Sequence, residues 1–406
     1  MVSIRRQLMG LGFIAGSSVM AMGAAHAMTG ETSIKIDGGP LGQLEMSGGM
    51  AGYGFVQSNS ETYTSGTRGE AMYLELQKNT GLVQFTVVGG NDAGGVMVGR
   101  SNGSVNLDGS NNSPDGNKGT SFLNKAYITI APPGSPVTVS GGILPGLEGY
   151  ESGAIWNDVS AFTSPLNYVT SSNQIGANAV ITEGPASLTV QIGDVNSTHV
   201  FNTLELMGVY NFNSNNVLTA FSTVKLGRVG LGASGVVLSE GNYGTSGATS
   251  SSLYSANANA VGAYYSWTQG NLNVVPEVQY LYTKVDHQIG INKLNSNLGV
   301  AVFGDYSFAN TPYSLGSWIA WDQNRGGVDS SNQTSNNPGL YAYNPNDSSV
   351  TFAVAPTWQY KYLYARLNGA VVHLLNRGYQ TSTSNSSWNS TKRTQFMAVV
   401  DTGIVF

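Results

Sequence analysis

The side chains best suited to acid–base or metal chemistry are few and widely separated in this sequence. His199, His287 and His373 lie far apart, so a metal centre or a Ser-His-acid triad would need partners that the sequence does not place. Residues 107–119, LDGSNNSPDGNKG, are rich in oxygen ligands but lack the order and the closing glutamate of an EF-hand. We expect no catalytic residue, metal or cofactor, and interpret the histidines as exposed residues near strand ends.

One apolar connection concentrates three of the few charges. The stretch PGLEGYESGAIWNDVSAFTSPLNY, residues 145–168, has no strand alternation and a poor helical period. Its three acids are Glu148, Glu151 and Asp158, and they stand among Tyr150, Trp156, Phe162 and several aliphatic residues. What such carboxylates could do depends on the elements around them.

The first residues predict export from the cytoplasm. Arg5 and Arg6 precede an apolar run that ends in Ala25-His26-Ala27, which is typical of a secretory signal peptide over residues 1–27. A membrane anchor is the weaker interpretation, because glycine and serine break the run. Of the 18 basic residues two lie in this segment, so the mature chain has 16 against 23 acidic residues, a formal charge of −7 that disfavours nucleic acid.

The composition excludes several classes of protein. The chain has no cysteine, so an exported protein of this length needs a large hydrogen-bonded structure instead of disulfides. Charged residues make up 10% of the chain, against about 25% in ordinary soluble domains. After the signal there is no run of about 18 apolar residues, which excludes a helical membrane protein.

Apolar residues instead recur at every second position. Between Val350 and Tyr360 large apolar side chains alternate with small and polar ones, which indicates a strand with one apolar face and one polar face. Short turns and long polar connections also alternate, which is typical of an up-and-down outer-membrane barrel. A soluble β-sandwich is disfavoured because the apolar outer face would lack a partner sheet.

The sequence therefore predicts an all-β fold, a transmembrane up-and-down antiparallel β-barrel of about sixteen strands within a single domain, residues 28–406. Short turns face the periplasm and long loops face outward. The weakest prediction is 217–238, which reads as one strand or two. The expected strands are 43–57, 70–78, 82–90, 120–131, 136–143, 172–182, 186–195, 202–212, 217–238, 256–267, 271–285, 298–308, 313–322, 350–360, 361–373 and 393–406.

Aromatic residues are expected to mark the membrane interfaces. They fall near the ends of the predicted strands, as the aromatic girdles of such barrels do. The last strand closes in Phe406 and is similar to the signal read by the barrel insertion machinery. The residues expected in the girdles are Trp267, Tyr306, Phe308, Tyr313, Trp358, Tyr360, Phe396 and Phe406.

Several stretches resemble β-barrel porin family 2, the OmpL-like group. They include GGILPGLEGYE, NQIGANAVITEGPASLTVQIGDVNST, LGVAVFGDYSFANTPYSLGSWIAW and VTFAVAPTWQYKYLYARLNGAVVH, spread over about 141–373. The resemblance implies a bacterial outer-membrane pore for small solutes, and it carries over Gly149-Tyr150-Glu151 and Arg366. The chain departs from the family in having fewer charges, which leaves the selectivity open.

Strand alternation then gives a set of inward-facing residues and a hypothesis for the channel. The acids outnumber the bases on the inner face, so a diffusion porin with a mild cation preference is expected. Residues 144–171 are expected to fold inward as a constriction, with Glu148, Tyr150, Glu151, Trp156 and Asp158 at the narrow point and the acids in water. The expected pore lining is Glu75, Lys125, Glu205, Glu277, Asp305, Asp322 and Arg366, with Asp401 on the same face.

Other interpretations stay open. The loop could instead pack on the surface or line a subunit contact. The barrel could be an adhesive or structural protein with a closed lumen, and an outer-membrane enzyme ranks third. The expected partners are outer-membrane lipid and lipopolysaccharide, the insertion machinery and small hydrophilic solutes; a homotrimer is open, and nucleic acid is not expected.

Overall fold

The structure is a computed structural model, and it places most of the chain after the expected signal peptide. It describes residues 33–59, 64–92, 96, 123–151, 155–167, 173–195, 200–227, 230–231, 237–238, 257–289, 291, 294–326, 348–376 and 392–406. The predicted signal peptide, the stretch 107–119 and His199 lie outside these ranges.

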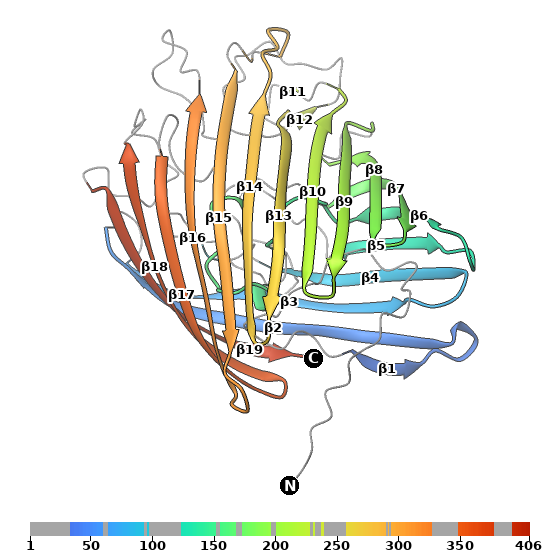
Figure 1. Cartoon of the computed structure of the whole chain (residues 1–406), viewed down its shortest axis with the longest axis horizontal. Coiled ribbons are helices and arrows are strands. Elements are labelled where there is room, and N and C mark those ends of the chain that lie inside the picture. The colour runs from blue at the N-terminus through green and yellow to red at the C-terminus, as the bar shows by residue number, and fades with distance from the viewer. Residues whose placement is uncertain are drawn as a thin grey trace.

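Sixteen antiparallel strands form a closed ring (Figure 1). Each strand pairs with its neighbours in sequence, β19 pairs with β2 to close the ring, and β9 pairs with β10. The strands are β2 (Gln43–Gln57), β3 (Ser65–Lys78), β4 (Val83–Asp92), β5 (Leu123–Ile130), β6 (Val137–Leu144), β7 (Gln174–Glu183), β8 (Ala186–Asp194), β9 (Thr203–Asn213), β10 (Asn216–Lys225), β13 (Asn259–Gln269), β14 (Leu272–Thr283), β15 (Asn295–Ser307), β16 (Tyr313–Gly326), β17 (Ser348–Tyr360), β18 (Leu363–Asn376) and β19 (Thr394–Val405).

The predicted barrel and its strand count are confirmed, with corrections at two places. In the stretch 217–238, β10 ends at Lys225. A separate two-stranded sheet of β11 (Gly230–Leu231) and β12 (Val237–Leu238) follows, and it does not pair with the strands of the ring. The sequence also missed β1 (Ile34–Asp37), a short strand that pairs with β2. The described residues contain two short 3-10 turns, Gly39–Leu41 and Ile155–Asn157, and no helix long and apolar enough to cross a membrane.

The alternation along the strands separates an apolar outer face from an inner face. In β15, Leu298, Val300 and Val302 are exposed, while Asn297, Ala301 and Phe303 at the alternate positions are buried. Because the side chains of a strand point alternately to opposite faces, this pattern assigns the exposed apolar set to the outside of the ring. Such an outer face is the one that lipid covers in an outer-membrane barrel.

Aromatic residues gather on the outer face near the short turns. Tyr306 and Phe308 lie 5.2 Å apart, and Trp358 stacks on Tyr360 at 6.5 Å. All four are exposed, as are Trp267 and Tyr313. Phe396 is exposed at the opposite end of the barrel, where the longer loops begin. Most of the expected girdle residues therefore lie at the short-turn end of the strands, the position of one interface belt.

Candidate functional site

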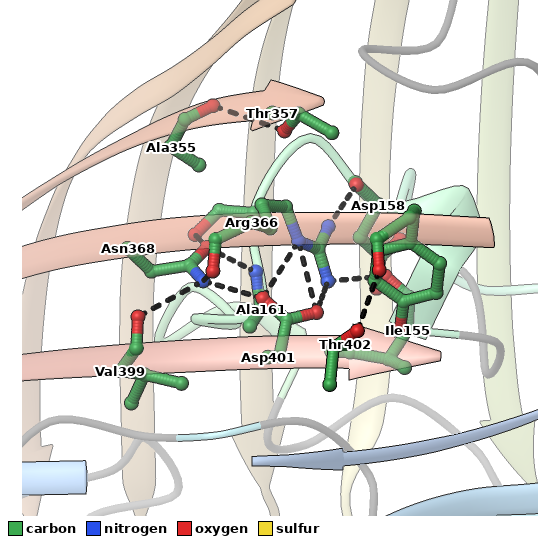
Figure 2. Close-up of polar contacts among 12 residues, drawn as sticks. Ile155, Asp158, Ala161, Ala355, Thr357, Arg366, Asn368, Val399, Asp401 and Thr402 are labelled. Carbon is green, nitrogen blue, oxygen red and sulfur yellow. Dashed lines mark hydrogen bonds and ion pairs between the residues drawn. The ribbon is translucent and has the colours of Figure 1, made fainter. Parts of the chain in front are cut away.

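The loop between β6 and β7 lies inside the ring of strands and is tied to the inner wall at β18 and β19. The Arg366 guanidinium donates to the backbone oxygens of Asp158 and Ile155 at 3.0 and 3.2 Å, and it forms an ion pair with Asp401 at 2.8 Å (Figure 2). Both partners of the ion pair are buried. Arg366 and Asp401 stand directly opposite each other in the ladder of β18 and β19, so the wall presents the guanidinium to the loop.

A second group of hydrogen bonds holds the next residues of the loop. Asn368, two residues along β18 from Arg366, accepts from the Ala161 backbone N–H at 2.9 Å and donates to Asp401 at 2.6 Å. The Trp318 indole of β16 donates to the Phe162 backbone oxygen at 2.9 Å. These wall side chains satisfy backbone groups of the loop that would otherwise be buried without partners.

The beginning of the loop is held on other strands of the ring. Gln191 of β8 donates to the Pro145 backbone oxygen at 2.8 Å, and Glu205 of β9 accepts from the Leu147 backbone N–H at 3.1 Å. The Tyr150 backbone N–H donates to Glu277 of β14. Since β8 and β18 are well separated around the ring, the described parts of this loop contact widely separated parts of the wall (Figure 1).

Apolar contacts fill the space between the loop and the wall. Trp156 is 1% exposed, lies 4.9 Å from Tyr73 of β3, and sits so close to Gly49 of β2 that a methyl group there would lie 2.9 Å from the indole. Tyr150 contacts Phe303 of β15 at 5.0 Å and Tyr264 of β13 at 5.6 Å. Glycine at position 49 therefore gives the tryptophan room against the strand.

The acids of the loop differ in environment from the expectation that all three face water. Asp158 is buried, with 6% of its surface exposed, whereas Glu148 and Glu151 keep partial exposure. Glu151 turns back on the loop, where its carboxylate accepts from the Ser164 backbone N–H at 2.8 Å and from the Ser164 hydroxyl. Burial raises the pKa of the Glu151 carboxyl above its ordinary value, against the lowering effect of these hydrogen bonds.

The residues expected to line a pore all lie on inner-face positions, but they fall into two groups. On β9 and the strands from β14 to β18 they are buried, and two of them form hydrogen bonds with other strand residues. Asp322 accepts from the Ser349 hydroxyl, and Asp305 accepts from the Asn273 amide at 3.3 Å. This buried group is Glu205, Glu277, Asp305, Asp322 and Arg366. On β3 and β5, Glu75 and Lys125 are half-buried.

Comparison with known proteins places this ring of strands in a family. The sequence profile described as "Putative beta-barrel porin-2, OmpL-like" matches residues 44–406. The chain belongs to this family. Membership assigns this porin-family barrel to the bacterial outer membrane, in agreement with the expected localisation. No characterised protein compared by sequence matches it.

Solved structures share the fold at low sequence identity. The outer-membrane expressed OmpT of Vibrio cholerae is 8% identical over 92% of this chain and 100% of its own, with a TM-score of 0.54. The anion-selective porin from Comamonas acidovorans is 8% identical over 89% and 99%, with a TM-score of 0.52. A trimer form of in-vitro folded OmpT is 8% identical over 89% and 99%, with a TM-score of 0.50.

Sequence reasoning missed several residues of this porin-family barrel that hold the loop. Asn368, Gln191 and Trp318 lie at inner-face positions, and strand alternation could have found that much. Their partners in the loop could not be found, because no local pattern links Asn368 to Ala161, 207 residues apart. Val96 was missed too; it pairs with Phe162 through an isolated bridge after β4.

The two histidines in the described part of the chain lie apart. His373 is exposed on the outer face of β18, and its Nδ1 lies 2.7 Å from the Thr394 hydroxyl. His287 follows β14 in the connection to β15. Within the described ranges no group of three or more histidine or acidic side chains is arranged to hold a metal ion.

Replacing Trp156 with alanine is expected to loosen the loop from the wall. Removing a buried aromatic side chain costs about 3–5 kcal/mol when the cavity does not collapse. We expect faster proteolytic cleavage within 145–173 of the refolded barrel, measured by mass spectrometry of the fragments. Trp358→Ala, on the outer face, is the control and should leave cleavage of the loop unchanged; equal rates in wild type and Trp156→Ala would contradict the packing.

Proposed function

We propose that this protein forms a water-filled channel for passive diffusion of ions and small hydrophilic solutes across the outer membrane, without a chemical step. The observation that carries the proposal is the closed sixteen-stranded ring with a loop held across its interior. Rings of sixteen to eighteen strands enclose an aqueous passage. The loop narrows that passage, so it acts as the constriction.

The half-buried residues indicate where the passage runs. Glu75, Lys125 and Asn178 keep partial exposure on the inner faces of β3, β5 and β7, whereas inner-face side chains of β14 to β19 are covered. The loop contacts described above are made on β2, β3, β8, β9, β13 to β16 and β18. We therefore place the open passage beside these partly exposed side chains, on the side of the ring away from β14 to β19.

Single-channel recording of the purified protein in planar lipid bilayers tests the proposal. Stable open steps in potassium chloride support a pore. A bilayer that stays silent after verified insertion favours the second candidate, a structural or adhesive barrel with a closed lumen. That candidate has its own observation, since side chains as large as Trp318, Phe303 and Arg366 on the inner face are fully buried.

A mild cation preference is the expected selectivity. Among the acids of the loop, Glu148 should contribute most to this preference. It is half-buried, whereas Asp158 is buried, and burial raises the pKa of the Glu151 carboxyl and so disfavours its charged form. Glu148→Gln should shift the reversal potential across a potassium chloride gradient toward zero. Asp158→Asn is the matched control and should shift it less; a clear anion preference of the wild type would refute the proposal.

The partners follow from the same proposal. The C-terminal strand that ends at Phe406 would engage the barrel insertion machinery, and outer-membrane lipid and lipopolysaccharide would surround the apolar face. A homotrimer is proposed because one structurally similar barrel is a trimer form. Enzymatic activity ranks behind both candidates, because His373 faces outward from the barrel and contacts Thr394.

A further inference from the structure

One residue of the connection between β4 and β5, Val96, pairs with the loop between β6 and β7. The Val96 backbone N–H donates to the Ala161 oxygen at 2.9 Å, and the Val96 oxygen accepts from the Thr163 N–H at 3.0 Å. These two bonds form a parallel bridge between Val96 and Phe162, and both side chains are 0% exposed. Val96 is therefore a buried contact between two connections that leave the ring at different strands.

The bridge completes the hydrogen bonding of a buried stretch of the loop. Side chains of the wall already satisfy the Ala161 N–H and the Phe162 oxygen, as described above. The Ala161 oxygen and the Thr163 N–H bond to Val96 instead, and both of these loop residues are buried. Because a buried backbone group without a partner costs free energy, this stretch needs Val96 as well as the wall.

The bonds to Val96 are made on the side of the loop that faces away from the wall. Successive carbonyl groups of an extended chain point to opposite sides. The Phe162 oxygen points to Trp318 of β16, so the Ala161 oxygen points away from Trp318, toward Val96. At this level Val96 covers the backbone edge that the loop would otherwise present to the rest of the lumen.

Val96 also ties the loop to a further part of the ring. It stands four residues after Asp92, the last residue of β4, and a chain of four residues spans at most about 14 Å. The strands β19, β2 and β3 stand between β18, which holds the same stretch of the loop, and β4. The contact therefore links β4 to β16 and β18 through the interior of the barrel.

We propose that Val96 is a positioning residue of the channel, which clamps the loop between β6 and β7 from the side of the lumen and so sets the width of the remaining passage. The inference rests on the proposed diffusion channel and deepens it, because it assigns part of the constriction to the connection between β4 and β5. Release of this clamp should let the stretch 160–164 move and the passage widen.

Cysteine pairing tests the contact whether or not the barrel conducts. The chain has no cysteine, so Val96→Cys with Phe162→Cys introduces a single possible disulfide. Paired strand residues lie about 4.8 Å apart, within the range of Cα distances that a disulfide tolerates. Val96→Cys with Val159→Cys is the matched control, because Val159 is buried in the same loop but stands three residues before the bridge. Oxidation should cross-link the first pair and not the second, as measured by mass spectrometry of the peptides.

Val96→Pro tests the effect of the clamp on conduction. Proline has no N–H, so the bond to the Ala161 oxygen is lost, whereas the control Val96→Ala keeps it. In planar bilayers Val96→Pro should show larger and noisier single-channel steps than wild type and Val96→Ala. The time spent in the larger state should rise about tenfold, the effect of losing one buried hydrogen bond. The oxidised pair Val96→Cys, Phe162→Cys should keep quiet steps, and heat-modifiable mobility in gels checks folding.

Two results would overturn the proposal. Failure of the first cysteine pair to cross-link would show that the two connections are not joined in the folded barrel. Equal conductance and noise of wild type and Val96→Pro would make the bridge a structural contact without influence on the passage.

A silent wild type would count against the diffusion channel, and Val96→Pro then decides the role of the clamp separately. Conduction by this variant alone would show that the clamp closes the lumen, and silence of both would reject the clamp. Where Val96→Pro does not fold, the cross-linked pair takes its place. Reduction of its disulfide should raise the conductance noise, and identical traces before and after reduction would refute the proposal.

Discussion

Arg366→Met is expected to destabilise the folded barrel by about 3–5 kcal/mol, because it leaves the Asp401 carboxylate buried without its partner. The guanidinium is also the donor for the backbone oxygens of Asp158 and Ile155, so the loop loses two hydrogen bonds at once. The free energy of unfolding of the protein in lipid vesicles, measured by urea titration, should fall. The conductance of the remaining folded channels should rise and become noisier.

The double variant Arg366→Met, Asp401→Leu separates the two effects. Replacing both partners of a buried ion pair with apolar residues is often neutral or stabilising. The double variant should therefore recover part of the free energy of unfolding, because Asp401→Leu also removes the acceptor of the Asn368 amide, while the loop still lacks the guanidinium. If it regains stability but keeps the noisy conductance, Arg366 holds the loop as well as the wall. If Arg366→Met alone unfolds no more easily than wild type, the ion pair is unimportant for the barrel.

The barrel was predictable because lipid and the strand pleat act on every residue of the chain. Outward positions must be apolar, so the spacing of Leu298, Val300 and Val302 predicts a strand even when the strands that pair with it are unknown. The prediction was weak only at 217–238, where apolar residues continue past Lys225 with a change of phase at Gly227-Arg228, and where pairing with the neighbouring strand stops. Pairing is a property of two segments, and the sequence of one segment does not fix it.

The candidate site was predictable only as a set of inward positions. Alternation places Arg366 and Asp401 on the inner face, but the register between β18 and β19 makes them partners. A long connection joins these strands, so no tight turn sets that register from local sequence. Contacts between Asn368 and Ala161, or between Gln191 and Pro145, join segments far apart in the chain.

The burial of the inner acids could not be predicted for the same reason, because it also depends on contacts between distant segments. Charge counting treated Glu277, Asp305 and Asp322 as exposed to water, because alternation says which way a side chain points and not what covers it. The loop and neighbouring wall residues cover all three. An inner face rich in acids is therefore compatible with a weaker cation preference than the count suggests, since paired or hydrogen-bonded carboxylates attract fewer counterions than open ones.

Replacing residues 147–166 with a short glycine-serine linker is expected to raise the single-channel conductance several-fold. The excised segment carries the contacts to Glu205, Glu277 and Trp318, and a sixteen-stranded ring without it should enclose an open aqueous passage. Ring closure does not depend on the segment, because β6 and β7 pair along their whole length. Recordings in concentrated potassium chloride, beside heat-modifiable mobility as a check of folding, measure the effect.

The control is a barrel shortened by the same number of residues between β16 and β17, in the connection 327–347. Its conductance should match wild type if the segment 147–166 alone sets the narrowest point. Unchanged conductance after excision of 147–166 would place the resistance elsewhere in the channel. A wild-type barrel that is silent and conducts only after the excision would mean that the loop closes the lumen, and the closed-barrel candidate would then replace the diffusion channel.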